Sequence, residues 1–319
     1  MNAAVVSSFD TPPRYTTFAN PVAAEQEVVV TVTAAGLHPV VKSQANGSHY
    51  ASPKALPFIP GVDGVGRLED GTRVYFGISR MPFGTFAEHC VTGRSMCLPI
   101  PDALGDATAA ALLNPGMSSW AALTARAQFV AGDSVLILGA TGVAGQLAVQ
   151  TAKRLGARRV VAVGRNPQVL ENLQPWADAV ISLNLEQEAL ISSFRGEWAK
   201  DAIDVVLDYL WGAPAERVLE AISQKGFKSA ASRIRFVQIG ASAGPTISLP
   251  AASLRSSALE LMGSGFGSVS IAKILQSAAD FISEAAREPF QIKVDTAPLS
   301  EVAALWNVPQ EGARRVFQP

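Results

Sequence analysis

The second half of the chain alternates short apolar runs with helical segments at a regular spacing. The runs of branched aliphatic and aromatic residues are Val135–Leu138, Val160–Val163, Val205–Asp208 and Phe236–Ile239. Between the first two, the segment Ala144–Leu155 has the polarity of a helix and is followed by Gly156. Strands that alternate with helices in this way predict a parallel, doubly wound sheet of the Rossmann type.

The first hundred or so residues have a different pattern, in which strand-like runs are separated by turn residues. Glu27–Thr33 and Thr72–Phe76 are rich in β-branched and aromatic residues, and the stretch between them, including Gly61–Gly66, is dense in glycine and proline. Short strands of this kind predict a small β-barrel. After Pro101 the composition changes, and two helices are expected at Ala107–Leu113 and around Ser119–Arg126.

The end of the chain returns to the pattern of its beginning. An amphipathic helix is predicted at Ile271–Arg287, followed by short strands at Gln291–Val294 and Arg314–Phe317. These strands fit the β-rich part better than the parallel sheet. We therefore predict an α/β protein of two domains, with residues 1–113 and 265–319 in a β-barrel domain and residues 114–264 in a doubly wound domain.

Composition and charge exclude several classes of function. The 319 residues are 48% hydrophobic and 17% charged, which is typical of a globular protein with a large core. A net charge of −1 argues against nucleic acid or an anionic membrane as a partner. No apolar run reaches the roughly 18 residues of a spanning helix, and the N-terminus lacks a signal-peptide pattern, so a cytoplasmic protein is expected. Cys90 and Cys97 lack metal-ligand spacing and are expected to be buried or half-buried thiols.

A glycine-rich turn after the first strand of the second half predicts a dinucleotide site. Positions 140, 142 and 145 fit the pattern G-x-G-x-x-G, with alanine in place of the first glycine. The middle glycine lets the backbone approach a pyrophosphate, and the helix that follows aims its first amides at the phosphates. The predicted phosphate-binding residues are Ala140, Thr141, Gly142, Val143, Ala144 and Gly145.

The end of the second strand predicts which dinucleotide binds. Sites selective for NAD place an acidic residue about 20 positions after the glycines, where it holds the ribose 2′-hydroxyl. This chain has Gly164, Arg165 and Asn166 there, and no acidic side chain before Glu171. Because a guanidinium can pair with a 2′-phosphate, the pattern favours NADPH.

Several motifs together resemble the medium-chain dehydrogenase/reductase superfamily. They are the glycine turn, Gly61–Gly66, Gly84–Glu88 and the closing segment Gly312–Phe317, in the expected order. Within the superfamily the chain is similar to the zinc-independent quinone oxidoreductase and enoyl reductase branch. The resemblance implies a GroES-like catalytic domain, a Rossmann domain, an active site in the cleft between them, and homodimers that often join their Rossmann sheets edge to edge.

The resemblance also implies that no metal is bound. Zinc-dependent relatives carry a cysteine where this chain has His38 and a histidine where it has Val62. The third ligand would come from near Asn114, where no cysteine occurs. Catalytic zinc needs three good ligands and an open position, which His38 alone cannot supply.

Candidates for the active site follow from the same resemblance. Hydride transfer to a conjugated acceptor needs a water-poor site and a donor for the developing oxyanion, for which Tyr50 and His38 are the candidates. The nicotinamide is expected against the ends of later strands, at Leu210, Ile239, Gly240 and Phe266. Quinone reductases usually have asparagine, aspartate and arginine where this chain has His38, Val41 and Ala45, so the acceptor is left open.

Three functions are compatible with these features. The first is an NADPH-dependent oxidoreductase that transfers hydride to a small apolar quinone or α,β-unsaturated carbonyl compound. The second is a tailoring enoyl reductase of a biosynthetic pathway. The third is a protein that kept an NADPH site without turnover, as a sensor or a structural protein. NADPH consumption with a panel of quinones and enones would separate these classes.

Overall fold

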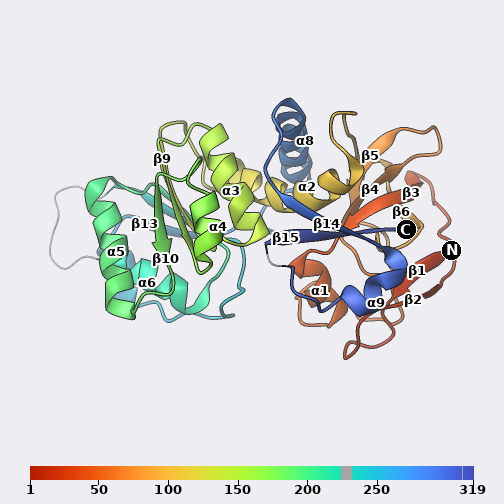
Figure 1. Ribbon diagram of the computed structural model, residues 1–319, viewed down its shortest axis with the longest axis horizontal. Coiled ribbons are helices and arrows are strands. Elements are labelled where there is room, and N and C mark those ends of the chain that lie inside the picture. The colour runs from red at the N-terminus through yellow and green to blue at the C-terminus, as the bar shows by residue number, and fades with distance from the viewer. Residues whose placement is uncertain (224–231, 311) are drawn as a thin grey trace. The chain divides into compact units, whose positions relative to one another are not determined.

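The structure, a computed structural model, describes residues 1–223, 232–310 and 312–319 (Figure 1). The chain divides into two compact units, one formed by residues 1–114 and 282–319 and the other by residues 115–281. Two helices join the units along the chain, α2 (Asp106–Ala121) and α8 (Ile271–Arg287). The second boundary thus falls inside α8 instead of at residue 264, because the buried ring of Phe281 packs edge-on against Trp120, with ring centroids 6.1 Å apart.

Helix α2 replaces the two helices predicted for this part of the chain. Pro115 lies inside it, although proline removes one hydrogen bond of a helix interior. Leu112, Leu113 and Ser119 on either side of the proline are buried, so packing outweighs the local preference to end the helix. A π-helical turn, Ala122–Arg126, continues the chain toward the parallel sheet.

In the described part of residues 115–281, six strands form a fully parallel sheet in the order β10-β9-β8-β11-β12-β13. Apart from the joining helices, its elements are β8 Ser134–Leu138, α3 Val143–Arg154, β9 Arg159–Gly164, α4 Pro167–Asn172, β10 Ala179–Ser182, α5 Gln187–Lys200, β11 Val205–Asp208, α6 Gly212–Ile222, β12 Ile234–Gln238, α7 Ala251–Arg255 and β13 Leu259–Gly263. The predicted doubly wound sheet is confirmed.

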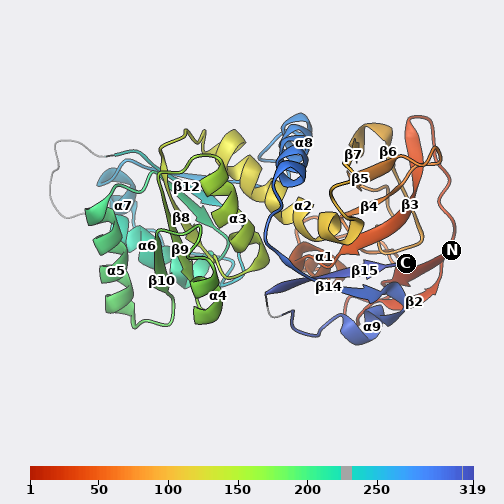
Figure 2. The same cartoon turned by 45° about the horizontal axis from the view of Figure 1, so that its top comes forward.

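Both faces of this sheet are buried, which explains why its strands are continuous apolar runs. Val135 and Ile137 of β8 pack on one face with residues of α3 and α4. Leu136 and Leu138 pack on the other face with Phe194 of α5 and residues of α6. Figure 2 shows the strands of this sheet together with helices α3, α4, α5 and α6. Alternate residues of one strand therefore belong to two separate cores.

The other unit is built mainly from β-strands, and its described residues form a seven-stranded sheet. The main path is β14-β15-β3-β4-β5-β7, β6 pairs with β3, and β1 and β2 form a separate pair. Its elements are β1 Asn2–Val5, β2 Arg14–Thr17, β3 Glu27–Gly36, α1 Pro39–Ala45, β4 Asp63–Arg67, β5 Arg73–Gly77, β6 His89–Gly93, β7 Cys97–Pro99, β14 Lys293–Pro298, α9 Val302–Leu305 and β15 Ala313–Gln318. As predicted, the last two strands of the chain join this unit.

Most of the glycine-rich segment Gly61–Gly66 forms β4 instead of a turn. The strand lies between β3 and β5 in the sheet. A Cβ on Gly66 would lie 2.4 Å from the carbonyl oxygen of Thr31, so the glycine permits a close approach of the two backbones where the register with β3 shifts.

No helix in the described ranges combines the length and apolar character needed to cross a membrane.

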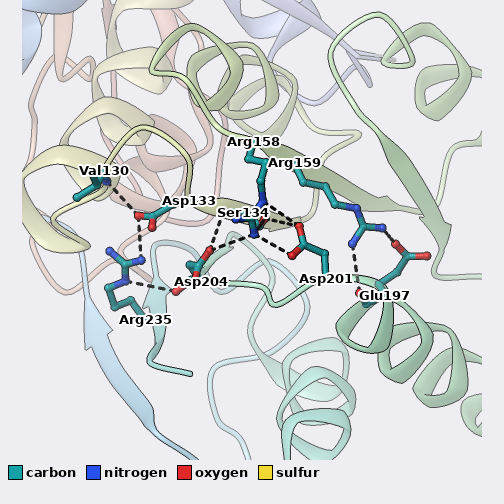
Figure 3. A network of polar contacts seen from close by, with 9 residues as sticks. All are labelled: Val130, Asp133, Ser134, Arg158, Arg159, Glu197, Asp201, Asp204 and Arg235. Atoms are coloured by element: carbon teal, nitrogen blue, oxygen red, sulfur yellow. Dashed lines mark hydrogen bonds and ion pairs between the residues drawn. The ribbon is translucent and has the colours of Figure 1, made fainter. Parts of the chain in front are cut away.

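A network of charged side chains gathers where the strands of the parallel sheet begin (Figure 3). Arg235 of β12, which is 6% exposed, donates to the carbonyl oxygens of Ala127 and Gln128 and to Asp133 Oδ2, the last at 2.9 Å. Asp204 Oδ2 accepts the Ser134 amide at 2.8 Å at the start of β8.

The network continues along the same edge to the start of β9. Arg158 pairs with Asp201 at 2.8 Å, and Arg159 pairs with Glu197 of α5. These contacts place paired charges beside the amino-terminal ends of the strands, away from the carboxyl-terminal ends.

We predict that Arg235→Met lowers the free energy of unfolding by about 3–5 kcal/mol, because the substitution leaves the Asp133 carboxylate without its buried partner. Arg233→Met is the matched control, since Arg233 pairs with Glu260 at the surface, and it should cost less than about 1 kcal/mol. Denaturant unfolding of the two variants measures both values. Equal losses would show that Arg235 adds no more than a surface ion pair.

Candidate functional site

The carboxyl-terminal edge of the parallel sheet brings the predicted dinucleotide residues together. From β8 the chain proceeds to β9 on one side, and it later returns to β11 on the other side of β8. Leu138 and Asp208, the last residues of β8 and β11, lie in register. In open parallel sheets, ligands bind at such a switch point, outside the carboxyl ends of the strands.

The turn between β8 and α3 is held to the sheet by its own backbone. The amides of Gly139 and Ala140 both donate to the carbonyl oxygen of Val163 in β9, at 2.9 and 2.8 Å. Gly139 has a φ of +95°, which favours glycine. A Cβ on Gly145 would lie 2.2 Å from the Gly139 carbonyl oxygen, so the start of α3 packs directly on the turn.

The start of α3 forms an open backbone cradle. Gly142 is the N-cap residue of α3, is exposed, and provides no side-chain cap, and Val143 and Ala144 follow it in the first turn. A Cβ on Gly142 would meet only the Gly139 carbonyl oxygen, at 3.6 Å. The first amides of a helix have no partner within the helix and carry the positive end of its dipole. The cradle therefore fits a pyrophosphate.

Residues at the end of β9 lie beside this cradle. Gly164 is buried, and a Cβ on it would lie 2.4 Å from the Thr141 methyl group, so the missing side chain makes room for Thr141. Arg165 is exposed, and its carbonyl oxygen accepts a bond from Asn184 at 2.8 Å, whereas its guanidinium has no partner among the described residues. Asn166 caps α4 by accepting the Val169 amide at 3.2 Å. The arrangement leaves an exposed cation at the end of β9, beside the cradle.

The last residue of β11, Asp208, was not singled out as functional by the sequence pattern. Asp208 is fully buried, and its Oδ1 accepts the amides of Leu210 and Trp211 at 2.8 and 3.0 Å. Its carbonyl oxygen accepts the amides of Ile239 and Gly240 at 2.7 and 3.1 Å. Burial raises the pKa of the Asp208 carboxyl to about 6, although the two backbone bonds oppose the shift. An acidic residue directly after the apolar run Val205–Leu207 was the signal available in the sequence.

Leu210 and Gly240 both pack against the turn segments at this edge. A Cβ on Gly139 would lie 3.1 Å from the Leu210 side chain, so the segments that follow β8 and β11 lie close together. Phe266, predicted beside the nicotinamide, is 48% exposed and lies in a loop after β13 that forms a bridge between Phe266 and Val269.

The two candidate donors of the β-rich unit have very different surroundings. His38 is 2% exposed at the N-cap of α1, and its Nε2 lies 3.3 Å from Asp63 Oδ1. Burial lowers the pKa of His38, against the opposing effect of Asp63. Burial also lowers the pKa of Arg314 to about 10. His38 therefore lies beside Asp63 in the core, where burial favours the neutral imidazole.

Tyr50, in contrast, is 77% exposed. Its ring packs on the imidazole of His49, with centroids 4.2 Å apart. The amide of Ala51 donates to His49 Nδ1 at 3.1 Å, so the loop is ordered by its own contacts. The phenol is thus accessible from solvent.

Two positions of α1 at which the resemblance led us to expect charged residues in quinone reductases are buried in the core. Val41 and Ala45 of α1 are 0% and 4% exposed and pack in one cluster with Leu37, Phe58 and residues of β1. Apolar side chains therefore occupy both positions on this face of α1.

In residues 1–223, 232–310 and 312–319, no three side chains of His, Cys, Asp or Glu form a group that could hold a metal ion. Val62 packs at the margin of the cluster that contains Phe58. Cys90 is buried and Cys97 half-buried, as predicted, and burial raises the pKa of their thiols to about 12 and about 11. Both thiols are therefore protonated and unreactive at neutral pH.

Comparison with known proteins adds three findings. Residues 107–203 match the family model of the alanine dehydrogenase/PNT C-terminal domain. A probable NADPH-dependent quinone reductase of Emericella nidulans is 29% identical, over the full length of both chains. The crystal structure of a quinone oxidoreductase from Thermus thermophilus, also determined with NADPH, is 27% identical with a TM-score of 0.81 over the whole of both chains.

A similarity of a different kind extends over part of the chain. One subunit of the phenolphthiocerol/phthiocerol polyketide synthase of Mycobacterium tuberculosis is 30% identical over 223 residues, which are 67% of this chain and 10% of that protein. The matching segment is thus a small part of a much longer protein.

Proposed function

Because this chain belongs to the medium-chain dehydrogenase/reductase superfamily, in its quinone oxidoreductase branch, we propose that it is an NADPH-dependent oxidoreductase that transfers hydride to a quinone or an α,β-unsaturated carbonyl compound. The observation that carries the proposal is the cradle at Gly142 together with the exposed Arg165 after β9. The first fits a pyrophosphate, and the second fits a 2′-phosphate.

The residues of this chain have separate tasks in the proposed reaction. NADPH, when bound, supplies the hydride. The backbone of the β8–α3 turn and Arg165 bind and orient the dinucleotide. Tyr50, an exposed phenol, donates a hydrogen bond and then a proton to the acceptor oxygen, on which negative charge develops when the hydride arrives. No metal ion is part of the proposal, since Val62 offers no donor atom where zinc-dependent relatives have a ligand.

The similarity to part of a polyketide synthase favours an enone as a second candidate acceptor, as in a tailoring enoyl reductase. Steady-state assays of NADPH consumption with a panel of quinones and enones, after exhaustive chelation, test both candidates. We expect turnover with at least one class. A protein that binds NADPH and turns over with neither class would be a sensor or structural protein, against the proposal.

We also propose a homodimer paired along β13. Support comes from its place at the edge of the sheet, where its outer backbone groups have no strand partner among the described residues, and from Leu261, which is 39% exposed. Light scattering should give twice the mass of one chain, and Leu261→Arg should shift the protein toward the monomer. A wild-type monomer would contradict this proposal.

For the cofactor, we predict that NADPH binds at least about tenfold more tightly than NADH, since a charge-assisted contact contributes roughly 1.5–3 kcal/mol. Arg165→Ala should remove the preference by weakening NADPH binding alone. Arg195→Ala, which removes an exposed arginine of α5, is the matched control and should leave both affinities unchanged. Fluorescence titration measures them. Equal wild-type affinities would overturn the role of Arg165.

For the proton donor, we predict that Tyr50→Phe lowers kcat for an enone roughly 10²-fold or more while the affinity for NADPH stays the same, because one well-aimed donor is lost. Quinones are stronger electrophiles and should lose less. His38→Ala is the comparison. Because His38 is buried, its loss should lower Tm clearly while kcat changes little. If kcat of Tyr50→Phe is unchanged for every acceptor, the proton comes from another source.

A further inference from the structure

Three segments at the carboxyl edge of the parallel sheet converge on Asp208. The Tyr209 amide bonds to the carbonyl oxygen of Leu138 at 3.0 Å, at the end of β8. The Asp208 carbonyl oxygen accepts two amides from the segment after β12, Ile239 and Gly240. A Cβ on Gly240 would lie 2.7 Å from the Tyr209 carbonyl oxygen, so this backbone packing leaves no room for adjustment.

The Asp208 side chain holds the following segment, 209–212, in a strained conformation. Trp211 has a φ of +55° and a ψ of −161°, a region that glycine alone adopts without strain. Oδ1 of Asp208 accepts the amides of both Leu210 and Trp211, so the carboxylate offsets the strain of the second residue by binding its amide. Helix α6 begins directly after it, at Gly212.

The second carboxylate oxygen of Asp208, Oδ2, takes no part in holding the turn. Oδ2 is buried and has no hydrogen-bond partner among the described residues. An asparagine could accept the same two amide bonds without placing a charge in the core. The fold therefore carries a buried charge that the turn by itself does not require.

We propose that the ionised Asp208 is a positioning residue for NADPH, which holds the segment 209–212 in the form that the dinucleotide needs, and that protonation of Asp208 releases this form and weakens NADPH binding. The inference rests on the proposed function, because the segment contains Leu210, a residue expected against the nicotinamide. Charge-assisted bonds to backbone amides are stronger than neutral ones, so the neutral acid holds the segment less firmly.

Protonation of the Asp208 carboxylate occurs in a pH range that binding experiments can reach. Burial raises the pKa of Asp208 to about 6, whereas burial also raises the pKa of the neighbouring Tyr209 phenol and keeps it neutral. The residues that lie in register with Asp208 in β8 and β12, Leu138 and Gln238, and those whose amides bond to its carbonyl oxygen, Ile239 and Gly240, carry no ionisable side chain. Because the folded-state pKa is raised, the stability that Asp208 contributes is complete at low pH and is lost as the pH rises through 6.

The test is Asp208→Asn, which keeps an acceptor for the two amides and removes the charge. The affinity for NADPH is measured by fluorescence titration from pH 5 to pH 8, with Tm at each pH. At pH 8 we expect the variant to bind NADPH roughly tenfold more weakly than wild type. At pH 5 the two should bind equally, so that the ratio of their Kd values titrates near pH 6. Tm of the variant at pH 8 should equal or exceed that of wild type.

Two controls isolate the carboxylate. The 2′-phosphate of NADPH also titrates near pH 6, but it contributes equally to both proteins and cancels in the ratio. Asp204→Asn changes a carboxylate at the opposite end of β11 and should leave the affinity and its pH profile unchanged.

The outcomes separate this inference from the function on which it rests. A ratio of Kd values that stays constant with pH, whether at one or above it, would overturn the role of the charge. A variant with weaker binding and a lower Tm at every pH would make Asp208 structural only, also against the inference. A wild-type protein that binds no NADPH would contradict the proposed function itself.

Discussion

Close packing of backbone on backbone at the carboxyl edge of the parallel sheet is the constraint on which the candidate site depends. Gly145 packs on the carbonyl oxygen of Gly139, Gly139 on Leu210, and Gly240 on the carbonyl oxygen of Tyr209. The approaches of Gly145 and Gly240 to carbonyl oxygens require residues without a side chain, whereas Gly139 contacts the Leu210 side chain. Together they tie the segments after β8, β11 and β12 into one unit and leave the amides of α3 accessible to a phosphate.

Charge is distributed unequally between the two ends of these strands. At the amino-terminal ends, Arg235, Arg158 and Arg159 each have acidic partners, so the charges there are compensated. At the carboxyl-terminal ends, Asp208 retains an oxygen with no partner in the described structure, and Arg165 has an exposed guanidinium. One end thus carries paired charges, whereas the other carries a carboxylate oxygen and a guanidinium that have no partner among the described residues.

The β-rich unit buries one of the two candidate donors and leaves the other exposed. Val41 and Ala45 complete the apolar face of α1, and His38 lies within the core next to Asp63. Tyr50 remains on the surface, supported by the ring of His49. Of the two candidate donors, the phenol therefore lies in an exposed loop, and two residues of the helix before it belong to the hydrophobic core.

The sequence by itself determined the features that depend on residues close together along the chain. Apolar runs such as Val135–Leu138 are readable because burial on both faces demands continuous hydrophobicity, and the glycines at 142 and 145 are readable because their spacing is local. The tertiary structure alone decided three other points: that Pro115 lies within a helix, that Gly64 and Gly66 lie in a strand, and that Asp208 is buried. Each depends on partners far along the chain, such as Thr31 for Gly66 and Ile239 for Asp208. Periodicity shows on which face of its own helix or strand a residue lies. Burial of a charge or close approach of two backbones is decided only when distant segments meet.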